Sequence, residues 1–360
     1  MTDESTRSAD NRAAEDVHQH ALVGDSEAEV ETEEEGEGGT NPAMPNGRVI
    51  EDPSVEVIDE DEDLLDDYPL EVEEIELVHL RISSIRALRL ERFTQVQKLC
   101  LRQNNITDIE CLSPLARALV DLDLYDNHIA HIHGLEDLAN LENLDLSFNN
   151  LKHIKRISHL AKLKNLYFVQ NRISRIEGLE GLAVLRNLEL GANRIREIEN
   201  IGHITALEEL WLGKNKITEL KNLSTLKNLR ILSIQSNRLT SITGLDELTS
   251  LEELYISHNA LTAITGLEAN QNLRVLDISN NQIAQLANLA HLSHLEELWA
   301  SNNKLASFEE IEQELGGLEE LVTVYFEGNP LMREAATGYR IKIKLALPRI
   351  KQIDATFVRP

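Results

Sequence analysis

The chain has 360 residues, of which 62 are acidic and 35 basic, so its formal net charge is −27. It contains no apolar run of the about 18 residues that a membrane-spanning helix needs, and we expect no membrane partner. The first 30 residues are polar and acidic, which argues against a secretory signal peptide, and two cysteines are too few for a disulfide framework.

The acidity is concentrated at the start of the chain. Residues 1–76 contain 27 acidic and 3 basic residues, whereas residues 77–360 contain 35 and 32. A segment of the first composition buries too little apolar area to offset its chain entropy, so we predict a disordered acidic tail over residues 1–74. Two roles stay open for it: a solvated leader, or an arm that contacts a basic partner surface.

A repeat of 22 residues follows the tail. Asparagines recur from Asn127 to Asn303 in eight steps of 22 residues, and each closes the pattern Leu-x-Leu-x-x-Asn or a close variant of it. This period and signature are typical of leucine-rich repeats, which stack into a solenoid with one shared core. We predict an α/β fold, a right-handed curved rod with a parallel sheet on its concave side and short 3-10-like turns on its convex side. About twelve repeats, the first degenerate, would occupy residues 75–330.

Each part of the repeat has an expected structural role. The two leucines of each strand point into the core, the residue between them faces the concave side, and the asparagine bonds buried turn backbone. Seven places after the asparagine stands Gly or Asn in seven of eight repeats, Arg156 being the exception, which predicts a left-handed turn. Near the end, residues 309–318 predict a longer helix. Residues 331–360 predict a cap with an amphipathic helix, a proline stop and an extended piece.

Signatures of catalysis are missing from the sequence. We find no phosphate-binding loop, no His-Glu-x-x-His, no Cys-x-x-Cys and no Gly-x-Ser-x-Gly. His128, His131 and His133 are close in sequence but fall on outward convex positions without a completing ligand. We therefore predict no catalytic residue, no cofactor and no metal site. An enzyme with an unrecognised site stays open as an alternative.

The residues between the two inward positions of successive strands form what we call the concave row. Aromatic residues fill five of its eleven positions although they make up 4% of the chain, four positions are acidic, and none is basic. The row consists of Cys100, Asp123, Asp145, Tyr167, Glu189, Trp211, Ser233, Tyr255, Asp277, Trp299 and Tyr325. Glu209, Glu253 and Glu297 precede three of the aromatics by two places.

This row predicts a protein interface. Exposed Trp and Tyr at regular steps are typical anchors of interfaces, and the acids among them imply a partner patch rich in Lys and Arg. The same acids argue against nucleic acid, whose phosphates they would repel. The strand preference of aromatic residues is the alternative explanation. A second, basic row follows the asparagines and is either a solvated rim or a contact for an acidic second partner; it comprises Arg172, Arg194, Lys216, Arg238 and Lys304.

The chain resembles a specific family over residues 77–360. The 22-residue units, the acidic tail and the end segment from Ala346 to Arg359 are similar to the leucine-rich-repeat regulatory subunit of protein phosphatase 1, of the regulatory subunit 7 type. Strand segments such as Leu99-Cys-Leu-Arg-Gln-Asn104 and Leu212-Gly-Lys-Asn-Lys-Ile-Thr218 carry this likeness.

The resemblance implies a non-enzymatic protein of nucleus and cytoplasm, with a role in mitosis, that binds the phosphatase catalytic subunit through its concave face. It also implies a ternary complex with a second small phosphatase inhibitor. The implied contacts fall on Asp145, Tyr167, Glu189, Trp211, Asp277, Glu297, Trp299 and Tyr325, to which the concave row adds Asp123 and Tyr255. A generic leucine-rich-repeat scaffold of the spliceosomal or axonemal type is the alternative function.

Overall fold

The computed structural model describes residues 64–335 and 337–359. Most of the predicted tail, residues 1–63, lies outside the described residues, so its predicted disorder stays a prediction. Residues 64–74, which the sequence analysis also assigned to the tail, pack onto the first repeat. Leu65 is 1% exposed there, and Arg92 Nη1 donates a hydrogen bond of 2.7 Å to Asp66 Oδ1.

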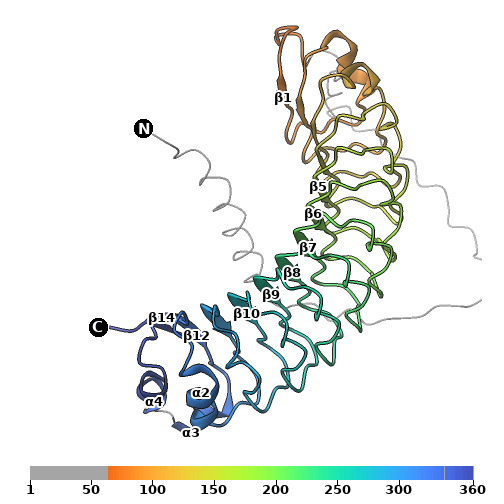
Figure 1. The fold of residues 1–360 in the computed structure, drawn as a ribbon. Coiled ribbons are helices and arrows are strands. Elements are labelled where there is room, and N and C mark those ends of the chain that lie inside the picture. Colours follow the sequence, from red (N-terminus) through yellow and green to blue (C-terminus); the bar gives the residue numbers. More distant parts are fainter. Residues whose placement is uncertain (1–63, 336, 360) are drawn as a thin grey trace, which may run out of the picture. The chain divides into compact units, whose positions relative to one another are not determined.

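The described residues form one sheet of fourteen short strands that follow one another in chain order. The strands lie on the inner side of a curved stack of turns (Figure 1). Neighbours pair in parallel from the first strand to the thirteenth, and the last strand returns antiparallel, so the predicted parallel sheet is confirmed. The strands are β1 Glu74–Glu76, β2 Lys98–Cys100, β3 Asp121–Asp123, β4 Asn143–Asp145, β5 Asn165–Tyr167, β6 Asn187–Glu189, β7 Glu209–Trp211, β8 Ile231–Ser233, β9 Glu253–Tyr255, β10 Val275–Asp277, β11 Glu297–Trp299, β12 Thr323–Tyr325, β13 Gln352–Ile353 and β14 Thr356–Phe357.

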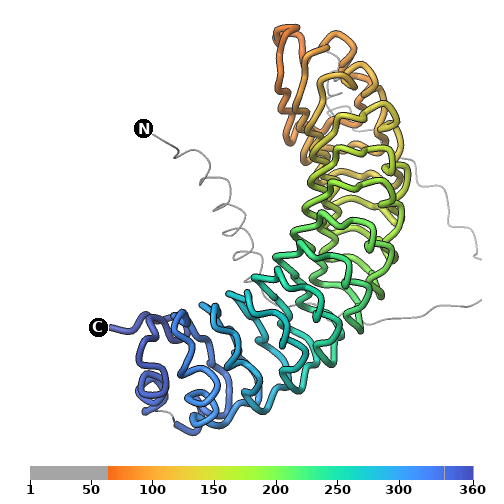
Figure 2. The backbone as a smooth tube through the Cα atoms, viewed as in Figure 1, coloured from red at the N-terminus to blue at the C-terminus, as the bar shows by residue number. Residues whose placement is uncertain are grey.

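The register of the sheet stacks equivalent residues of successive repeats. Leu144 of β4 pairs with Leu166 of β5, which pairs with Leu188 of β6, and all three are fully buried. The backbone follows nearly the same path in every turn (Figure 2). The predicted inward position of the leucines is therefore confirmed, and one continuous apolar core runs under the sheet. The first strand follows the same register, because Ile75 of β1 pairs with Leu99 of β2.

The asparagines form a ladder of buried hydrogen bonds, and we call them the ladder asparagines. Asn215 shows the pattern: its Nδ2 donates to the carbonyls of Leu190 at 2.9 Å and Leu212 at 3.1 Å. Its Oδ1 accepts from the backbone N–H of Ile195 at 2.9 Å. One side chain thus satisfies donors and acceptors of two successive repeats, which buried backbone requires.

Two residues of each repeat adopt a left-handed backbone. The predicted position seven after the asparagine has positive φ throughout, for example 70° at Gly178 and 59° at Arg156. A Cβ at Gly178 would lie 2.2 Å from the carbonyl oxygen of Ile154. Where Asn replaces Gly, as at Asn200, the side chain donates to the equivalent carbonyl, that of Ile176, at 2.8 Å. The second left-handed position directly precedes each ladder asparagine and was not predicted.

The convex side consists of tight turns with hydrogen bonds from residue i to residue i−3, such as Leu138 N to Leu135 O at 3.0 Å. This bonding confirms the predicted 3-10-like turns. They extend into 3-10 helices only near the start of the described chain, at η2 Arg86–Leu88, η3 Leu90–Arg92 and η4 Ser113–Leu115.

The end of the stack is covered by helices and by the last hairpin. The predicted longer helix is α2 Phe308–Leu315, and the predicted amphipathic helix is α4 Tyr339–Ala346, preceded by α3 Pro330–Ala335. Asp354 bonds the last repeat in a different way from a ladder asparagine, because it only accepts: its Oδ1 accepts from the backbone N–H of Phe326 at 2.8 Å and of Glu327 at 3.1 Å. Within the described chain, no helix is long and apolar enough to cross a membrane.

Candidate protein-binding face

The first and third residues of each strand share the concave face, because side chains alternate along a strand. In β7, Glu209 and Trp211 are half-buried on this face while Leu210 is fully buried behind it. The same pattern places every residue of the concave row on the concave side, as predicted. Its role in partner binding stays a prediction.

The C-terminal half of the face carries a series of aromatic rings in contact. The ring centroids of Trp211 and Tyr255 lie 6.3 Å apart with planes inclined by 19°, and those of Tyr255 and Trp299 also lie 6.3 Å apart. The series ends with Tyr325, whose ring centroid lies 5.9 Å from that of Trp299. Ser233, on the strand between Trp211 and Tyr255, is only 1% exposed, so the two flanking rings meet above a small residue.

Each central aromatic is held by the glutamate two places before it. Tyr255 donates its hydroxyl to Glu253 Oε2 at 2.7 Å, and Trp299 Nε1 donates to Glu297 Oε2 at 3.0 Å. Trp211 Nε1 makes the same bond to Glu209 Oε2 at 3.3 Å. These bonds orient the rings before any partner arrives, which lowers the entropy that binding would otherwise cost.

The last ring is fixed by the cap. Gln352 Nε2, from β13, donates a hydrogen bond of 2.6 Å to the hydroxyl oxygen of Tyr325 in β12. The aromatic series therefore ends against the C-terminal segment.

The N-terminal half of the face is acidic. Asp123 Oδ1 accepts from the backbone N–H of Tyr125 at 3.0 Å, and Asp145 Oδ1 accepts from that of Ser147 at 2.8 Å. Arg102 Nε lies 3.4 Å from Asp123 Oδ2, and its guanidinium also lies over the Tyr125 ring at 4.2 Å. This cation was not anticipated, because Arg102 stands outside the concave row.

Partial burial raises the pKa of these acids, because it disfavours their charged form. It raises the pKa of Glu189 to about 7, with a further contribution from the charges of Asp145 and Glu209. Burial likewise raises the pKa of Asp123 to about 6. The pKa of Tyr167 is raised as well, by burial and then by the charge of Glu189. A cation brought to this half of the face would therefore gain more than one brought to fully hydrated carboxylates.

Asp277 is the least accessible of the predicted contact residues. Its side chain is 8% exposed, and its Oδ1 accepts from the backbone N–H of Ser279 at 2.9 Å. Burial raises its pKa. It lies on β10, between the strands that carry Tyr255 and Trp299, so those two rings dominate the surface there.

Sequence reasoning missed a ladder of ion pairs along one edge of the face. The residues directly before β4 to β11 are all charged, and neighbours pair across repeats: Glu142 with Lys164 (2.7 Å), Arg186 with Glu208 (3.4 Å), Arg230 with Glu252 (2.8 Å) and Arg274 with Glu296 (2.9 Å). We call this set the charge ladder. The signal was present in the sequence as a charged residue at one repeat position, alternating in sign from Arg186 to Glu296.

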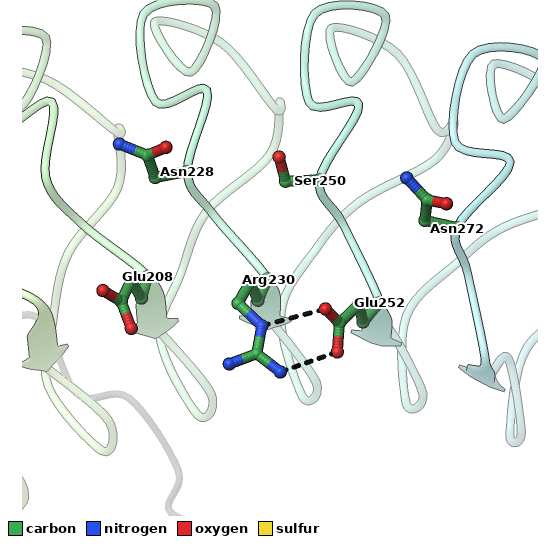
Figure 3. A pocket seen from close by; sticks show the side chains of 6 residues that line it. All are labelled: Glu208, Asn228, Arg230, Ser250, Glu252 and Asn272. Carbon is green, nitrogen blue, oxygen red and sulfur yellow. Dashed lines mark hydrogen bonds and ion pairs between the residues drawn. The ribbon is translucent and has the colours of Figure 1, made fainter.

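A shallow hollow lies along the charge ladder and is lined by Glu208, Arg230 and Glu252, with Asn228, Ser250 and Asn272 at its other side (Figure 3). The guanidinium of Arg230 forms two hydrogen bonds with the Glu252 carboxylate, at 2.9 and 2.8 Å. The two charged groups at the centre of the hollow therefore satisfy each other.

The remaining candidates for chemistry have no catalytic or metal-binding arrangement in the part of the chain that the structure describes. No group of three or more His, Cys, Asp or Glu side chains there could hold a metal ion. His133 Nε2 lies 3.2 Å from Asp108 Oδ1, while His128 and His131 are exposed, as expected for outward positions. Burial raises the pKa of the Cys100 thiol, which disfavours the reactive thiolate.

Comparison with known proteins supports both the fold and the resemblance. The family model of leucine-rich repeats in two copies matches residues 205–247 and 249–291. The chain is 55% identical over 93 residues to the protein phosphatase 1 regulatory subunit SDS22 of Schizosaccharomyces pombe. It is 60% identical over 47 residues to the protein phosphatase 1 regulatory subunit 7 of Xenopus tropicalis. An internalin of Listeria monocytogenes has a similar structure, with a TM-score of 0.64 at 25% identity, over 84% of this chain and 94% of that one.

The matches to the named regulatory subunits are partial. They cover 26% of this chain and 27% of the S. pombe protein, and 13% of each chain for the X. tropicalis protein. The fold is the predicted leucine-rich-repeat solenoid, and part of the chain is homologous to these phosphatase regulatory subunits.

Proposed function

We propose that this chain is a non-enzymatic regulatory subunit that binds the catalytic subunit of protein phosphatase 1 through its concave face and controls its activity, maturation or localisation. The names of the partial homologues support this assignment. The observation that carries it is the face itself, where four rings from Trp211 to Tyr325 lie in sequence beside a group of half-buried acids.

The two halves of the face would contribute differently to binding. The aromatic half offers large, oriented, half-buried rings, which are the side chains that typically anchor interfaces. The acidic half offers carboxylates whose raised pKa a basic patch on the partner would lower again. The partner surface that fits is therefore apolar in one part and rich in Lys and Arg in the other.

A binding assay with purified components tests the proposal. The full-length chain is mixed with the phosphatase 1 catalytic subunit and separated by size-exclusion chromatography with light scattering; a 1:1 complex is expected. A related metallophosphatase catalytic subunit is the control and should elute separately. The isolated chain should hydrolyse no phosphate ester. Separate elution of this chain and the phosphatase 1 subunit would reject the proposal in favour of a generic scaffold.

Three finer expectations accompany the proposal. We propose a location in nucleus and cytoplasm and a role in mitosis, which fluorescence microscopy of a tagged chain through the cell cycle can check. We also propose that a second small phosphatase inhibitor joins the complex. Mass spectrometry of the native complex, purified through the tag, should then find three proteins, and a strictly binary complex would contradict this part.

A further inference from the structure

The last strand of the sheet carries an exposed aromatic side chain. Phe357 lies in β14, at the C-terminal end of the stack (Figure 1). Its exposed fraction of 75% is the highest among the large hydrophobic residues of the described chain. An apolar ring is unfavourable in water, and a ring so little buried contributes little to the core. The fold itself therefore gives no reason for a phenylalanine at this position.

The pairing of the last three strands places Phe357 on the concave face. Gln352 of β13 pairs with Thr323 of β12 on one side and with Phe357 of β14 on the other. Residues that pair directly across neighbouring strands point to the same face of the sheet. Gln352 points to the concave side, because its Nε2 donates to the hydroxyl oxygen of Tyr325 at 2.6 Å. Phe357 therefore shares the face of Tyr325, at two strand spacings, roughly 10 Å.

The backbone around Phe357 is held on both sides. Arg340 of α4 donates from Nη2 to the carbonyl of Thr356 at 3.1 Å. The backbone N–H of Val358 donates to the carbonyl of Lys351 at 2.7 Å, and the Val358 side chain packs against the core. The strand thus presents the ring from a fixed backbone. A partner that covers this ring would have to order little more than the side chain itself.

We propose that Phe357 is a further anchor of the concave face, and that the partner on this face extends beyond Tyr325 to cover it with an apolar patch. The rings in contact end at Tyr325, and Gln352 separates them from Phe357. One surface that covers the aromatic half of the face would reach Phe357 by continuing over β13. The inference rests on the proposed function, because it takes the phosphatase catalytic subunit as this partner.

The size of the patch favours this partner over a second copy of the chain. A stable interface between two proteins buries about 800 Å² on each of them. A single aromatic side chain buries roughly 150–250 Å², which is too little to hold two copies together at β14 alone. A partner that already covers the rings from Trp211 to Tyr325 needs to reach only one more side chain.

Titration of the full-length chain with the phosphatase 1 catalytic subunit tests the inference. Phe357→Ala should bind about tenfold more weakly, because it removes an anchoring ring, whereas Phe357→Trp should stay within about threefold. The matched control is Leu345→Ala, which removes a side chain of similar exposure, 73%, from α4 and not from the sheet. It should bind within roughly twofold of the unmodified chain. Thermal melting of both alanine variants should be unchanged, because neither side chain belongs to the core.

Photocross-linking gives a second readout. A p-benzoylphenylalanine in place of Phe357 should cross-link to the phosphatase subunit, and one in place of Leu345 should not. If the unmodified chain binds, equal affinity of Phe357→Ala or equal losses in both alanine variants would overturn the inference and leave the proposed function intact. No binding by the unmodified chain would overturn both. Cross-links from position 357 only to another copy of the chain would overturn the inference in favour of self-association.

Discussion

The indole of Trp299 contacts the Glu297 carboxylate and the rings of Tyr255 and Tyr325 on the concave face. All of them lie at the surface of the sheet, above a core that is closed by Leu298 and Ala300. The ring therefore supports its neighbours on the face and contributes little to the core. An experiment can therefore distinguish a role of Trp299 in binding from a role in folding.

We expect Trp299→Ala to weaken binding of the phosphatase catalytic subunit by about 2–4 kcal/mol, because truncating a central aromatic anchor typically costs that much. Trp211→Ala should act in the same direction. Calorimetric titration gives the affinity, and thermal melting of the free chain gives the stability. Phe308→Ala, which removes a half-buried aromatic of α2 outside the concave row, is the control for general effects of truncation. A large fall in melting temperature with unchanged affinity would assign both tryptophans to the core.

The raised pKa of Glu189 predicts how stability depends on pH. In the unfolded chain the carboxyl has its ordinary pKa of 4.5, and in the folded chain about 7, so between these values the folded state binds more protons. Stability contributed by this group therefore falls as pH rises from about 4.5 to about 7. Glu189→Gln should stabilise the chain more at pH 8 than at pH 5.5, by a difference on the order of 1–2 kcal/mol.

Urea denaturation at the two pH values measures this difference. Glu252→Gln is the control: Arg230 lowers the pKa of Glu252 below 4.5, so this carboxyl is ionised at both pH values and the variant should destabilise the chain equally at both. A Glu189→Gln effect that is equal at both pH values would show that the carboxyl is not buried as described. Binding of a basic partner should also strengthen between pH 6 and 8, and Glu189→Gln should weaken that dependence.

Which residues share the concave face could be predicted from the sequence, since alternation along a strand leaves no freedom there. What each side chain contacts could not be predicted. The sequence shows Glu209, Glu253 and Glu297 only as acids two places before an aromatic, whereas in the structure each accepts a hydrogen bond from that aromatic. Arg102 reaches Asp123 from outside the row, a contact that depends on the rotamer of a long side chain.

At the scale of the element, the ladder asparagine is the group on which the turn after each strand depends. Asn215→Ala should destabilise the chain by roughly 2–4 kcal/mol, because it leaves the carbonyls of Leu190 and Leu212 and the N–H of Ile195 buried without partners. Chemical denaturation measures the loss. Asn228→Ala, whose exposed side chain bonds one carbonyl, is the control and should cost less than 1 kcal/mol or so. Similar losses in both variants would contradict a special role for the ladder.

The left-handed turns show where sequence reasoning at this scale ends. Seven places after the asparagine, the residue types Gly and Asn predict the left-handed conformation. Directly before the asparagine, residues as different as Phe148, Ala192 and Lys214 adopt φ near 54°, so no residue preference reveals it. The stacking of neighbouring repeats imposes that conformation, and the stack is not visible in a single unit.

At the scale of the whole molecule, the cap covers the last edge of the sheet and so prevents that edge from pairing with another chain. Removing residues 331–360 takes away Asp354 and β13, which leaves the N–H groups of Phe326 and Glu327 and the edge of β12 unpaired. We expect a lower melting temperature and self-association, because open sheet edges pair with other chains. Thermal melting and light scattering measure the two effects.

Deletion of residues 1–63 is the matched control, since it keeps Leu65 in the core. It should leave the melting temperature unchanged and the affinity for the phosphatase within about tenfold, roughly 1.4 kcal/mol. A monomeric cap deletion of normal stability would show that α2 alone closes the stack. The sequence predicted a cap from its length and its helix pattern, but not that the Asp354 carboxylate would accept from the backbone N–H groups of Phe326 and Glu327.

The charge ladder also bears on how such a chain can lengthen or shorten in evolution. From Arg186 to Glu296 the sign alternates at every repeat, so the smallest unit that can be duplicated or lost without setting like charges side by side is two repeats, or 44 residues. Gain or loss of one repeat would bring two arginines or two glutamates together. We therefore expect repeat number in related chains to change in steps of two across this region.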